Sequence, residues 1–188
     1  MIKIGITGSI SSGKTTASKI LSNKRGPLFS ADKEVKKIYQ DSSFRQQLIK
    51  SFNIQGKSNL KNLLKSKISK KKIDIKRLEK IIHPLVRKEM LKFLKKYKNR
   101  KTLFYEIPLL IESKLMNFFD IIIFIKAKKK VRLKRFMSKG GDKKLFIIMN
   151  KKQLPDLKKI KFCDHVVVNE KNLNILKKNL LDIIKVYV

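Results

Sequence analysis

The fold of this chain is decided by residues 2–16, whose sequence is IKIGITGSISSGKTT. The apolar stretch at residues 2–7 is typical of a buried strand, and the pattern from Lys14 to about Asn23 predicts a helix. Between them, Gly8–Thr15 matches G-x-x-x-x-G-K-[ST], in which consecutive backbone N–H groups point onto phosphate oxygens. Because the match lies between a strand and a helix, it predicts a phosphate-binding loop rather than a fortuitous Gly-Lys turn.

Strands and helices continue to alternate along the chain. Pro27–Ser30 predicts a short second strand, so that strand, glycine-bearing turn, helix and strand form a βαβ unit with parallel strands. Strands are also expected at residues 102–106, 120–125 and 165–169, and helices at residues 128–138 and from about Asn172 onward. We therefore expect an α/β fold with a doubly wound parallel sheet, as in the core of P-loop kinases.

The middle of the chain, residues 42–97, is expected to be helical and strongly basic. Its apolar residues recur at helical spacing and are Leu78, Ile81, Ile82, Leu85, Val86 and Met90. Pro84 is expected to kink or interrupt this stretch, because proline has no N–H to donate and its ring clashes with the preceding turn. We interpret this helical part as a substrate-binding cap on the α/β core.

The composition suits one compact domain but carries an unusual charge. The chain has 188 residues, 42% of them hydrophobic, and a formal net charge of +34. One explanation is a polyanionic partner, above all nucleic acid. However, only seven of the 48 basic residues are Arg and the lysines are dispersed, whereas specific nucleic-acid readers use Arg for bidentate contacts. We favour compositional drift and expect no nucleic-acid partner, although the positive field should attract a phosphorylated substrate.

The sequence shows neither a membrane-spanning nor a zinc-binding pattern. It has no apolar run of the roughly 18 residues that a membrane helix needs, and its start lacks a signal-peptide layout. Its single cysteine, Cys163, cannot form an internal disulfide, which fits a reducing cytoplasm. No Cys/His cluster or Ser-His-Asp spacing is present. We expect a cytoplasmic protein without a membrane partner, either a monomer or a weak homo-oligomer.

Two carboxylates follow predicted strands and are candidates for the chemistry. Lys14 is expected to reach the terminal phosphates and Thr15 to bind Mg²⁺. Asp32 and Glu106 are expected at the same sheet edge as the loop, where one could act on an acceptor hydroxyl and another on metal-bound water. Alternatively, Asp32 could begin a helix and Glu106 could be an ordinary strand-end residue. Asp120 lies at the wrong end of its strand and is discounted.

Basic residues near a glycine pair are candidates for contact with the transferred phosphate. Arg132 and Arg135 precede Gly140-Gly141, a candidate hinge for a segment that closes over the nucleotide. They could equally form a solvated helix face. His83 and His165 are isolated in the sequence, and from the residues alone we interpret both as structural or surface histidines.

Taken together, the motifs resemble the dephospho-CoA kinase family over nearly the whole chain. The matching segments are Ile6-Thr7-Gly8 with its loop, Ala31-Asp32, His83-Pro84-Leu85-Val86-Arg87, Ile107-Pro108-Leu109-Leu110-Ile111-Glu112, Arg135, Gln153-Leu154-Pro155, and Cys163-Asp164 followed by Asn169. The His-Pro-Leu-x-Arg and Pro-Leu-Leu-x-Glu segments discriminate best among nucleotide-type kinases.

The resemblance implies an enzyme that uses ATP and Mg²⁺ to phosphorylate the ribose 3′-hydroxyl of dephospho-CoA, giving coenzyme A and ADP in the final step of coenzyme A biosynthesis. It also implies three parts within one P-loop kinase domain. These are a nucleotide core (residues 1–40, 101–138 and 160–188), a helical CoA-binding part (41–100) and a lid (139–159).

The resemblance also implies roles for individual residues. The expected ATP-binding residues are Gly8, Ser11, Ser12, Gly13, Lys14, Thr15 and Thr16. The expected catalytic residues are Asp32 as the base for the 3′-hydroxyl, Lys14, and Arg135 on the lid helix. Residues expected to bind the acceptor substrate are His83, Arg87, Glu106 and Pro108. The resemblance thus reverses the structural interpretation of His83.

Several positions depart from the family pattern. They are Ser9 and Ser11 in place of Gly, Ser30 and Glu106 in place of Asp, Lys139-Gly140 in place of an Arg-Asp pair, and Met149 in place of Arg. The two serines therefore restrict the backbone conformations that the loop can adopt, although its backbone N–H groups can still donate hydrogen bonds to phosphate. Loss of the lid arginine removes a bidentate phosphate contact, so we expect reduced turnover rather than loss of function.

Two other functions remain as alternatives. One is a P-loop kinase for another nucleotide or small alcohol, which would not be expected to carry both discriminating segments. The other is a basic nucleic-acid-binding protein with a vestigial P-loop, for which the charge is the only support.

Overall fold

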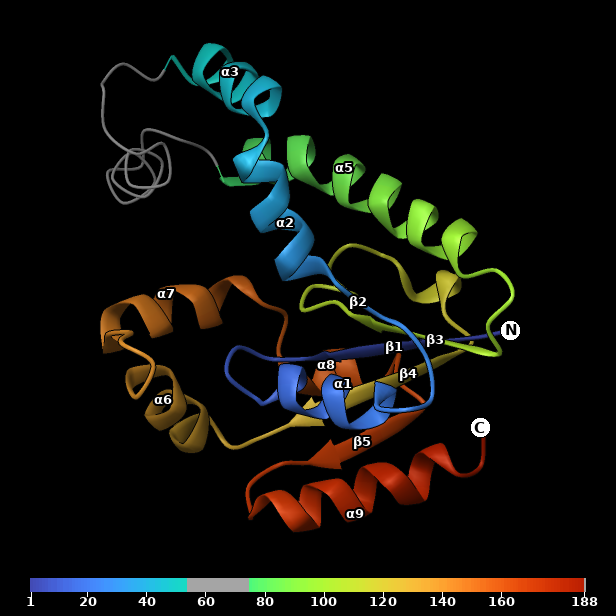
Figure 1. Ribbon diagram of the computed structural model, residues 1–188. Coiled ribbons are helices and arrows are strands. Elements are labelled where there is room, and N and C mark those ends of the chain that lie inside the picture. The colour runs from blue at the N-terminus through green and yellow to red at the C-terminus, as the bar shows by residue number, and fades with distance from the viewer. Residues whose placement is uncertain (54–74, 188) are drawn as a thin grey trace. The chain divides into compact units, whose positions relative to one another are not determined.

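The computed structural model describes residues 1–53 and 75–187 (Figure 1). The chain divides into two compact units, of which the first comprises Met1–Ala31 and Leu94–Val188 and the second comprises Asp32–Phe93. Part of the predicted helical middle, residues 54–74, lies outside the described residues. None of the helices in the described ranges is both long and apolar enough to cross a membrane.

The first unit is built on a parallel five-stranded sheet with the strand order β2-β3-β1-β4-β5. The strands are β1 (Ile2–Gly8), β2 (Leu28–Ser30), β3 (Thr102–Glu106), β4 (Ile121–Lys126) and β5 (His165–Val168). β1 lies at the centre, where its residue Gly5 is in register with Tyr105 on one side and Ile122 on the other. The predicted doubly wound α/β fold is confirmed, with strand bounds within one or two residues of those expected.

Helices α1 (Lys14–Ser22) and α9 (Leu173–Ile184) pack on one face of this sheet (Figure 1). The core between them consists of Ile4, Ile6, Ala17, Leu21, Phe104, Ile121, Ile123, Ile125, Val167, Leu176, Leu180 and Ile184. Burying this apolar surface on both helices and strands is what makes the short strands stable.

The opposite face of the sheet is covered by the segment after β3, which includes the 3₁₀ helix η1 (Met116–Phe118). Tyr105 on β3 packs against Phe118 and Phe119, with ring centroids 5.5 and 5.4 Å apart. Gly5 allows this close approach, since a Cβ there would lie 2.8 Å from Leu110 Cδ1. The central strand is therefore held tightly on both faces.

Three more helices complete the first unit: α6 (Lys129–Met137), α7 (Lys143–Lys152) and α8 (Asp156–Ile160). α6 ends before Gly140-Gly141, as expected. Asp142 caps α7 by accepting a hydrogen bond of 2.8 Å from the Leu145 N–H. The fully buried Phe146 then packs against Phe136 with centroids 5.7 Å apart, which fixes α7 to α6.

The second unit contains most of α2 (Ala31–Gln40), together with α3 (Ser42–Ser51) and α5 (Ile75–Lys96). Its core is formed by Phe44, Leu48, Leu78 and Ile82. Pro84 was expected to kink or interrupt the helical stretch that contains it; α5 runs through it without a break, so the interruption does not occur. Pro84 is on the exposed side of the helix, and packing of the apolar face before and after it offsets the lost hydrogen bond.

Candidate active site

The phosphate loop joins the carboxyl end of β1 to the amino end of α1. Gly8 and Gly13 have φ angles of +148° and +99°, which residues with a side chain rarely adopt. A Cβ at Gly8 would lie 2.4 Å from the Ile125 carbonyl oxygen, and one at Gly13 would lie 2.1 Å from Asn169 Nδ2. Both motif glycines are therefore required by backbone conformation and by close packing.

Within the loop, the Ser9 carbonyl accepts two hydrogen bonds that fix Lys14 and Ser12. It accepts hydrogen bonds from Lys14 Nζ at 3.0 Å and from the Ser12 N–H at 3.1 Å. The Lys14 side chain is buried, so its ammonium is held over the loop rather than in solvent. This places the cation beside the backbone donors, which is what a phosphate group requires.

The two serines that replace family glycines differ in their surroundings. Ser11 has a φ of +56°, in the left-handed region, which costs a side-chain-bearing residue about 1 kcal/mol or more. Ser9 is 2% exposed, and its hydroxyl donates to the Asp156 carboxylate. Ser11 thus carries backbone strain, whereas Ser9 has acquired a hydrogen-bonding partner.

Glu106, at the end of β3, lies beside the loop as the strand-end rule predicts. Thr15 Oγ1 donates to Glu106 Oε1 at 2.5 Å, and Ser30 Oγ donates to Glu106 Oε2 at 3.1 Å. Ser30 and Glu106 are also register partners on adjacent strands. Glu106 is 3% exposed, so its charge depends on these hydroxyls.

An oxygen-only cluster of this kind suits a hard cation such as Mg²⁺, which is usually bound by one or two carboxylates together with substrate phosphates. Within the described ranges, no three His, Cys, Asp or Glu side chains come together to hold a metal ion. The residues that could contribute are therefore the Thr15 hydroxyl and the Glu106 carboxylate, assisted by the nucleotide.

The arginines of α6 are not a solvated helix face. Arg135 Nη1 donates to the Asn169 carbonyl at 2.9 Å and to the Ser12 carbonyl at 3.4 Å. Arg132 is 6% exposed and donates from Nη1 to Asn150 Oδ1 at 2.7 Å. Burial lowers the pKa of Arg132, while the Asp156 carboxylate acts in the opposite direction. Arg135 therefore contacts the phosphate loop, and Arg132 anchors α6 to α7.

The remaining predicted site residues are divided between the units. Asp32 is the second residue of α2, in its first turn, where a carboxylate interacts favourably with the helix dipole. His83 and Arg87 are four residues apart on α5 and so share one face of that helix. These three belong to the second unit. Pro108 lies in the first, where its carbonyl accepts a hydrogen bond of 3.3 Å from Thr7 Oγ1.

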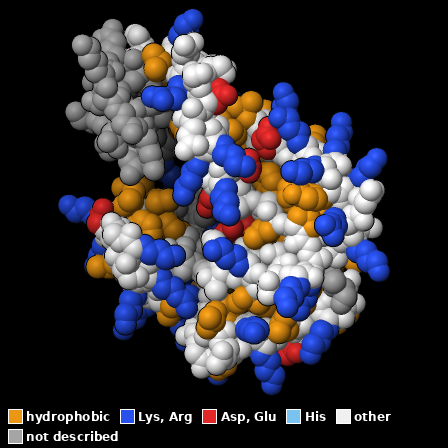
Figure 2. Space-filling view, in the orientation of Figure 1, with side chains coloured by type: hydrophobic (Ala, Val, Ile, Leu, Met, Phe, Trp, Pro, Cys, Tyr) orange, Lys and Arg blue, Asp and Glu red, His pale blue; other side chains and the backbone are white. Residues whose placement is uncertain are grey.

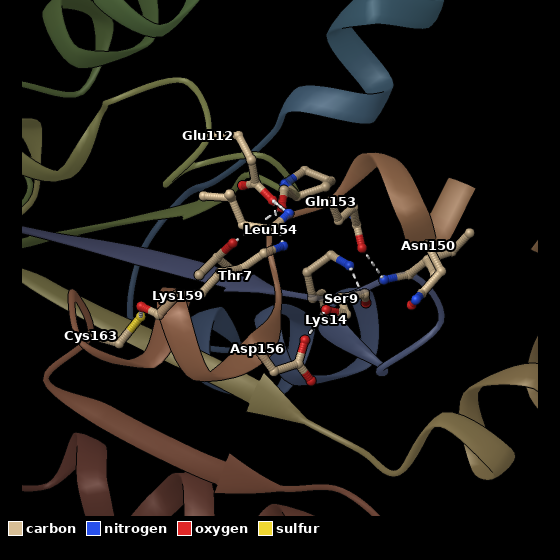
Figure 3. A network of polar contacts seen from close by, with 12 residues as sticks. Thr7, Ser9, Lys14, Glu112, Asn150, Gln153, Leu154, Asp156, Lys159 and Cys163 are labelled. Carbon is tan, nitrogen blue, oxygen red and sulfur yellow. Dashed lines mark hydrogen bonds and ion pairs between the residues drawn. The ribbon is translucent and has the colours of Figure 1, made fainter. Parts of the chain in front are cut away.

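Three contacts with the phosphate loop were not predicted from the sequence, although Gln153 and Asn169 belong to segments that match the family pattern. Asn169 Nδ2 donates to the Ser12 carbonyl at 2.8 Å, and Gln153 Oε1 accepts from the Ile10 N–H at 2.8 Å. Asp156 accepts from Ser9 (Figure 3). Asn169 directly follows β5, so the strand-end rule that selected Glu106 would have found it. Gln153 lies in a segment that matches the family pattern, but its contact with the loop could not be predicted from that match, and no local signal marks Asp156, because both contacts depend on how the α7–α8 connection packs against the loop.

Comparison with known proteins agrees with this geometry. The family model described as dephospho-CoA kinase matches residues 2–174. The dephospho-CoA kinase of Rickettsia conorii is 32% identical, with 98% of this chain and 97% of that protein covered. The corresponding protein of Fusobacterium nucleatum is 33% identical, with 94% of each covered.

Solved structures show the same fold. The crystal structure of TT1252 from Thermus thermophilus is 25% identical and superposes with a TM-score of 0.82, covering 100% of this chain and 98% of that one. A dephospho-CoA kinase structure from Campylobacter jejuni has a TM-score of 0.65 at 23% identity, covering 97% and 95%. Because the family model spans most of the sequence and both relatives match it nearly from end to end, the chain belongs to the dephospho-CoA kinase family.

Proposed function

We propose that this chain transfers the terminal phosphoryl group of ATP, bound with Mg²⁺, to the ribose 3′-hydroxyl of dephospho-CoA. The products are coenzyme A and ADP, and the reaction is the final step of coenzyme A biosynthesis. The observation that carries the proposal is the glycine-bounded phosphate loop, with Lys14 over it and Glu106 beside it, in a member of this family.

For the donor, the backbone N–H groups of residues 11–16, with Gly8 opening the loop, bind the phosphates of ATP. Lys14 exchanges its neutral acceptor, the Ser9 carbonyl, for phosphate oxygens, a stronger charge-assisted contact. Arg135 lies against the Ser12 carbonyl and adds positive charge near the same phosphates. These cations stabilise the charge that develops on the transferred group.

The Thr15 hydroxyl and the Glu106 carboxylate would hold Mg²⁺, which would supply positive charge to stabilise the charge that develops on the phosphates. The hydrogen bond from Thr15 to Glu106 keeps the two groups together at this place. This role for Glu106 is favoured over direct contact with the acceptor, because one of the hydroxyls that donate to it belongs to Thr15, the other proposed Mg²⁺ ligand.

For the acceptor, Asp32 is the base that takes the proton of the 3′-hydroxyl. His83 and Arg87 bind the anionic groups of dephospho-CoA from their shared face of α5, and Pro108 is a further residue that binds this substrate. Residues 41–100 form the CoA-binding part, residues 139–159 form the lid, and the remainder is the nucleotide core. Turnover is reduced relative to family members with the lid arginine, because Met149 replaces it.

We further propose that the charge serves no nucleic-acid partner and that the protein works in the cytoplasm as a monomer or weak homo-oligomer. Figure 2 supports the first of these, since Lys and Arg side chains are scattered over the visible face instead of forming one patch. A dispersed field attracts phosphorylated substrates without creating a nucleic-acid groove. A lone half-buried cysteine suits a reducing compartment.

The test is to incubate the purified chain with Mg²⁺, ATP and dephospho-CoA and to measure coenzyme A by chromatography. We expect coenzyme A to appear with ADP in equal amounts, and Lys14→Ala to abolish both. Phosphorylation of another alcohol, but not of dephospho-CoA, would reject the acceptor and keep the kinase. Salt-sensitive binding of RNA or DNA without consumption of ATP would favour the nucleic-acid alternative.

A further inference from the structure

Two side chains from the α7–α8 connection contact the phosphate loop at consecutive residues (Figure 3). Gln153, which follows α7, accepts the Ile10 N–H through Oε1 at 2.8 Å. Asp156, the first residue of α8, accepts the Ser9 hydroxyl through Oδ1. We call Gln153 and Asp156 the loop clamp.

The segment that carries the loop clamp is held in place by contacts with Glu112. Lys159 on α8 is 0% exposed, and its Nζ lies 2.6 Å from Glu112 Oε1. The same Glu112 oxygen accepts the Leu154 N–H at 3.1 Å, so one half-buried carboxylate holds both the connection and α8. A buried ion pair is costly to break by removing one partner. Asp156 therefore lies between two residues that are fixed to the body of the first unit, and Gln153 directly precedes the first of them.

The clamp acts on the part of the loop that supports Lys14. Ser9 is the residue whose carbonyl accepts from Lys14 Nζ and from the Ser12 N–H. Both clamp contacts fall on Ser9 and Ile10, ahead of residues 11–16, whose N–H groups we assign to the phosphates. The clamp can thus hold the Ser9–Ile10 peptide while ATP is bound, so it favours a binding-ready loop instead of competing with the nucleotide.

The negative charge of Asp156 is partly balanced by the positive charge of Arg132. The Asp156 carboxylate contacts Ser9 in the phosphate loop and, if it stood alone, would repel the phosphates that we assign to that loop. Arg132, which also donates from Nη1 to the Ile10 carbonyl at 3.4 Å, interacts electrostatically with Asp156. This attraction offsets part of the repulsion that a carboxylate would otherwise cause at an anion-binding site.

We propose that Gln153 and Asp156 are positioning residues that pre-organise the phosphate loop for ATP by holding Ile10 and Ser9. The proposal deepens the proposed function and rests on it only for the identity of the nucleotide. The family pattern has glycine at position 9. In this chain Asp156 accepts a hydrogen bond from the Ser9 hydroxyl, so the serine that replaces the glycine has a hydrogen-bonding partner. Neither residue touches the reacting atoms in this assignment, so their effect should appear in ATP binding and not in acceptor binding.

The first test measures ATP affinity by calorimetry for the unaltered chain and for Gln153→Met, which keeps the length of the side chain but removes its acceptor. We expect the Kd for ATP to rise about fivefold, as for loss of one ordinary hydrogen bond. The KM for dephospho-CoA and the thermal midpoint should change little. Asn174→Met, an amide-to-methionine change at an exposed position of α9, is the matched control and should leave ATP affinity unaltered.

The second test is a cycle of Ser9→Ala, Asp156→Ala and the double variant, with Asp156→Asn added because asparagine keeps the Oδ1 acceptor. We expect each alanine variant to weaken ATP binding, the double variant to be no worse than the weaker single one, and Asp156→Asn to recover most of the affinity. The cycle also covers the case in which Gln153→Met does not fold.

The proposal is overturned if folded Gln153→Met binds ATP within twofold of the unaltered chain, or if the Ser9 and Asp156 effects simply add. A chain that binds no ATP overturns it together with the proposed function. A chain that binds ATP with the expected variant effects but makes no coenzyme A leaves the loop clamp standing and rejects only the acceptor.

Discussion

Thr15 on α1 donates its hydroxyl to Glu106 at the end of β3, with 2.5 Å between Oγ1 and Oε1. The two residues are 91 positions apart in the sequence, and the parallel pairing of β1 with β3 brings them to one sheet edge. A hydroxyl and a carboxylate so close to the phosphate loop form the most direct candidate for the Mg²⁺ site, from which the first prediction follows.

Glu106→Gln should weaken the apparent affinity for Mg²⁺ about tenfold or more and lower turnover, because the amide cannot supply the anionic charge beside the cation. A titration of kinase activity with Mg²⁺ measures this. Glu106→Asp is the matched control and should retain most activity, since the carboxylate is preserved and Asp is usual here in the family. Full Mg²⁺-dependent turnover of Glu106→Gln would reject the assignment.

Asp32→Asn should slow phosphoryl transfer by at least about a hundredfold, the usual scale for loss of a general base, while ATP affinity stays nearly the same. Steady-state kinetics and calorimetry together separate the two effects. Glu34→Gln, in the first turn of the same helix, removes a surface pair with Lys37 and should have little effect. If Asp32→Asn turned over normally, another group would have to accept the proton.

Ser11→Gly should raise the free energy of unfolding by up to about 1 kcal/mol, because glycine adopts the left-handed φ of +56° without strain. Denaturant unfolding measures the change. Ser51→Gly, at the last residue of α3, should have the opposite sign, since glycine destabilises a helix. A loss of stability at both positions would mean that the loop is not strained at Ser11.

Lys159→Met should lower the free energy of unfolding by about 1–3 kcal/mol, because the half-buried Glu112 carboxylate loses the cation with which it pairs. The double variant Lys159→Met with Glu112→Gln should recover part of this loss, since the charge is removed together with its partner. Thermal and denaturant unfolding of both variants provide the comparison. An additive or larger loss in the double variant would contradict a coupled ion pair.

Cys163 should resist alkylation in the folded protein. Burial raises the pKa of its thiol to about 12, so the reactive thiolate is scarce in the folded state, whereas an unfolded thiol titrates near its ordinary value. At pH 8 we expect iodoacetamide to react about a hundredfold or more slowly with the native chain than with the urea-unfolded chain. Native reactivity should rise with pH well beyond 9. Similar rates in both states at pH 8 would show that the thiol is accessible.

Much of the site could be predicted from local patterns. The glycines of the loop are required by backbone conformation, and that requirement is visible in a short stretch of sequence. Glu106 was found because parallel strands end at one edge of a sheet, a rule that needs only the order of strands. The interruption predicted at Pro84 does not occur. There the local preference of proline to end a helix was outweighed by packing along the rest of α5.

The sequence by itself determined the strands, the helices α1, α6 and α9 and the phosphate loop, because each depends on the conformational preferences and apolar spacing of neighbouring residues. It did not predict α7 or α8. Only the tertiary structure decided which side chains hold the loop in place. Gln153, Asp156 and Asn169 contact it across separations of 143, 147 and 157 residues. Such contacts depend on how α8 and β5 pack against the body of the first unit, and directional hydrogen bonds form only after that packing has set the distances between their atoms.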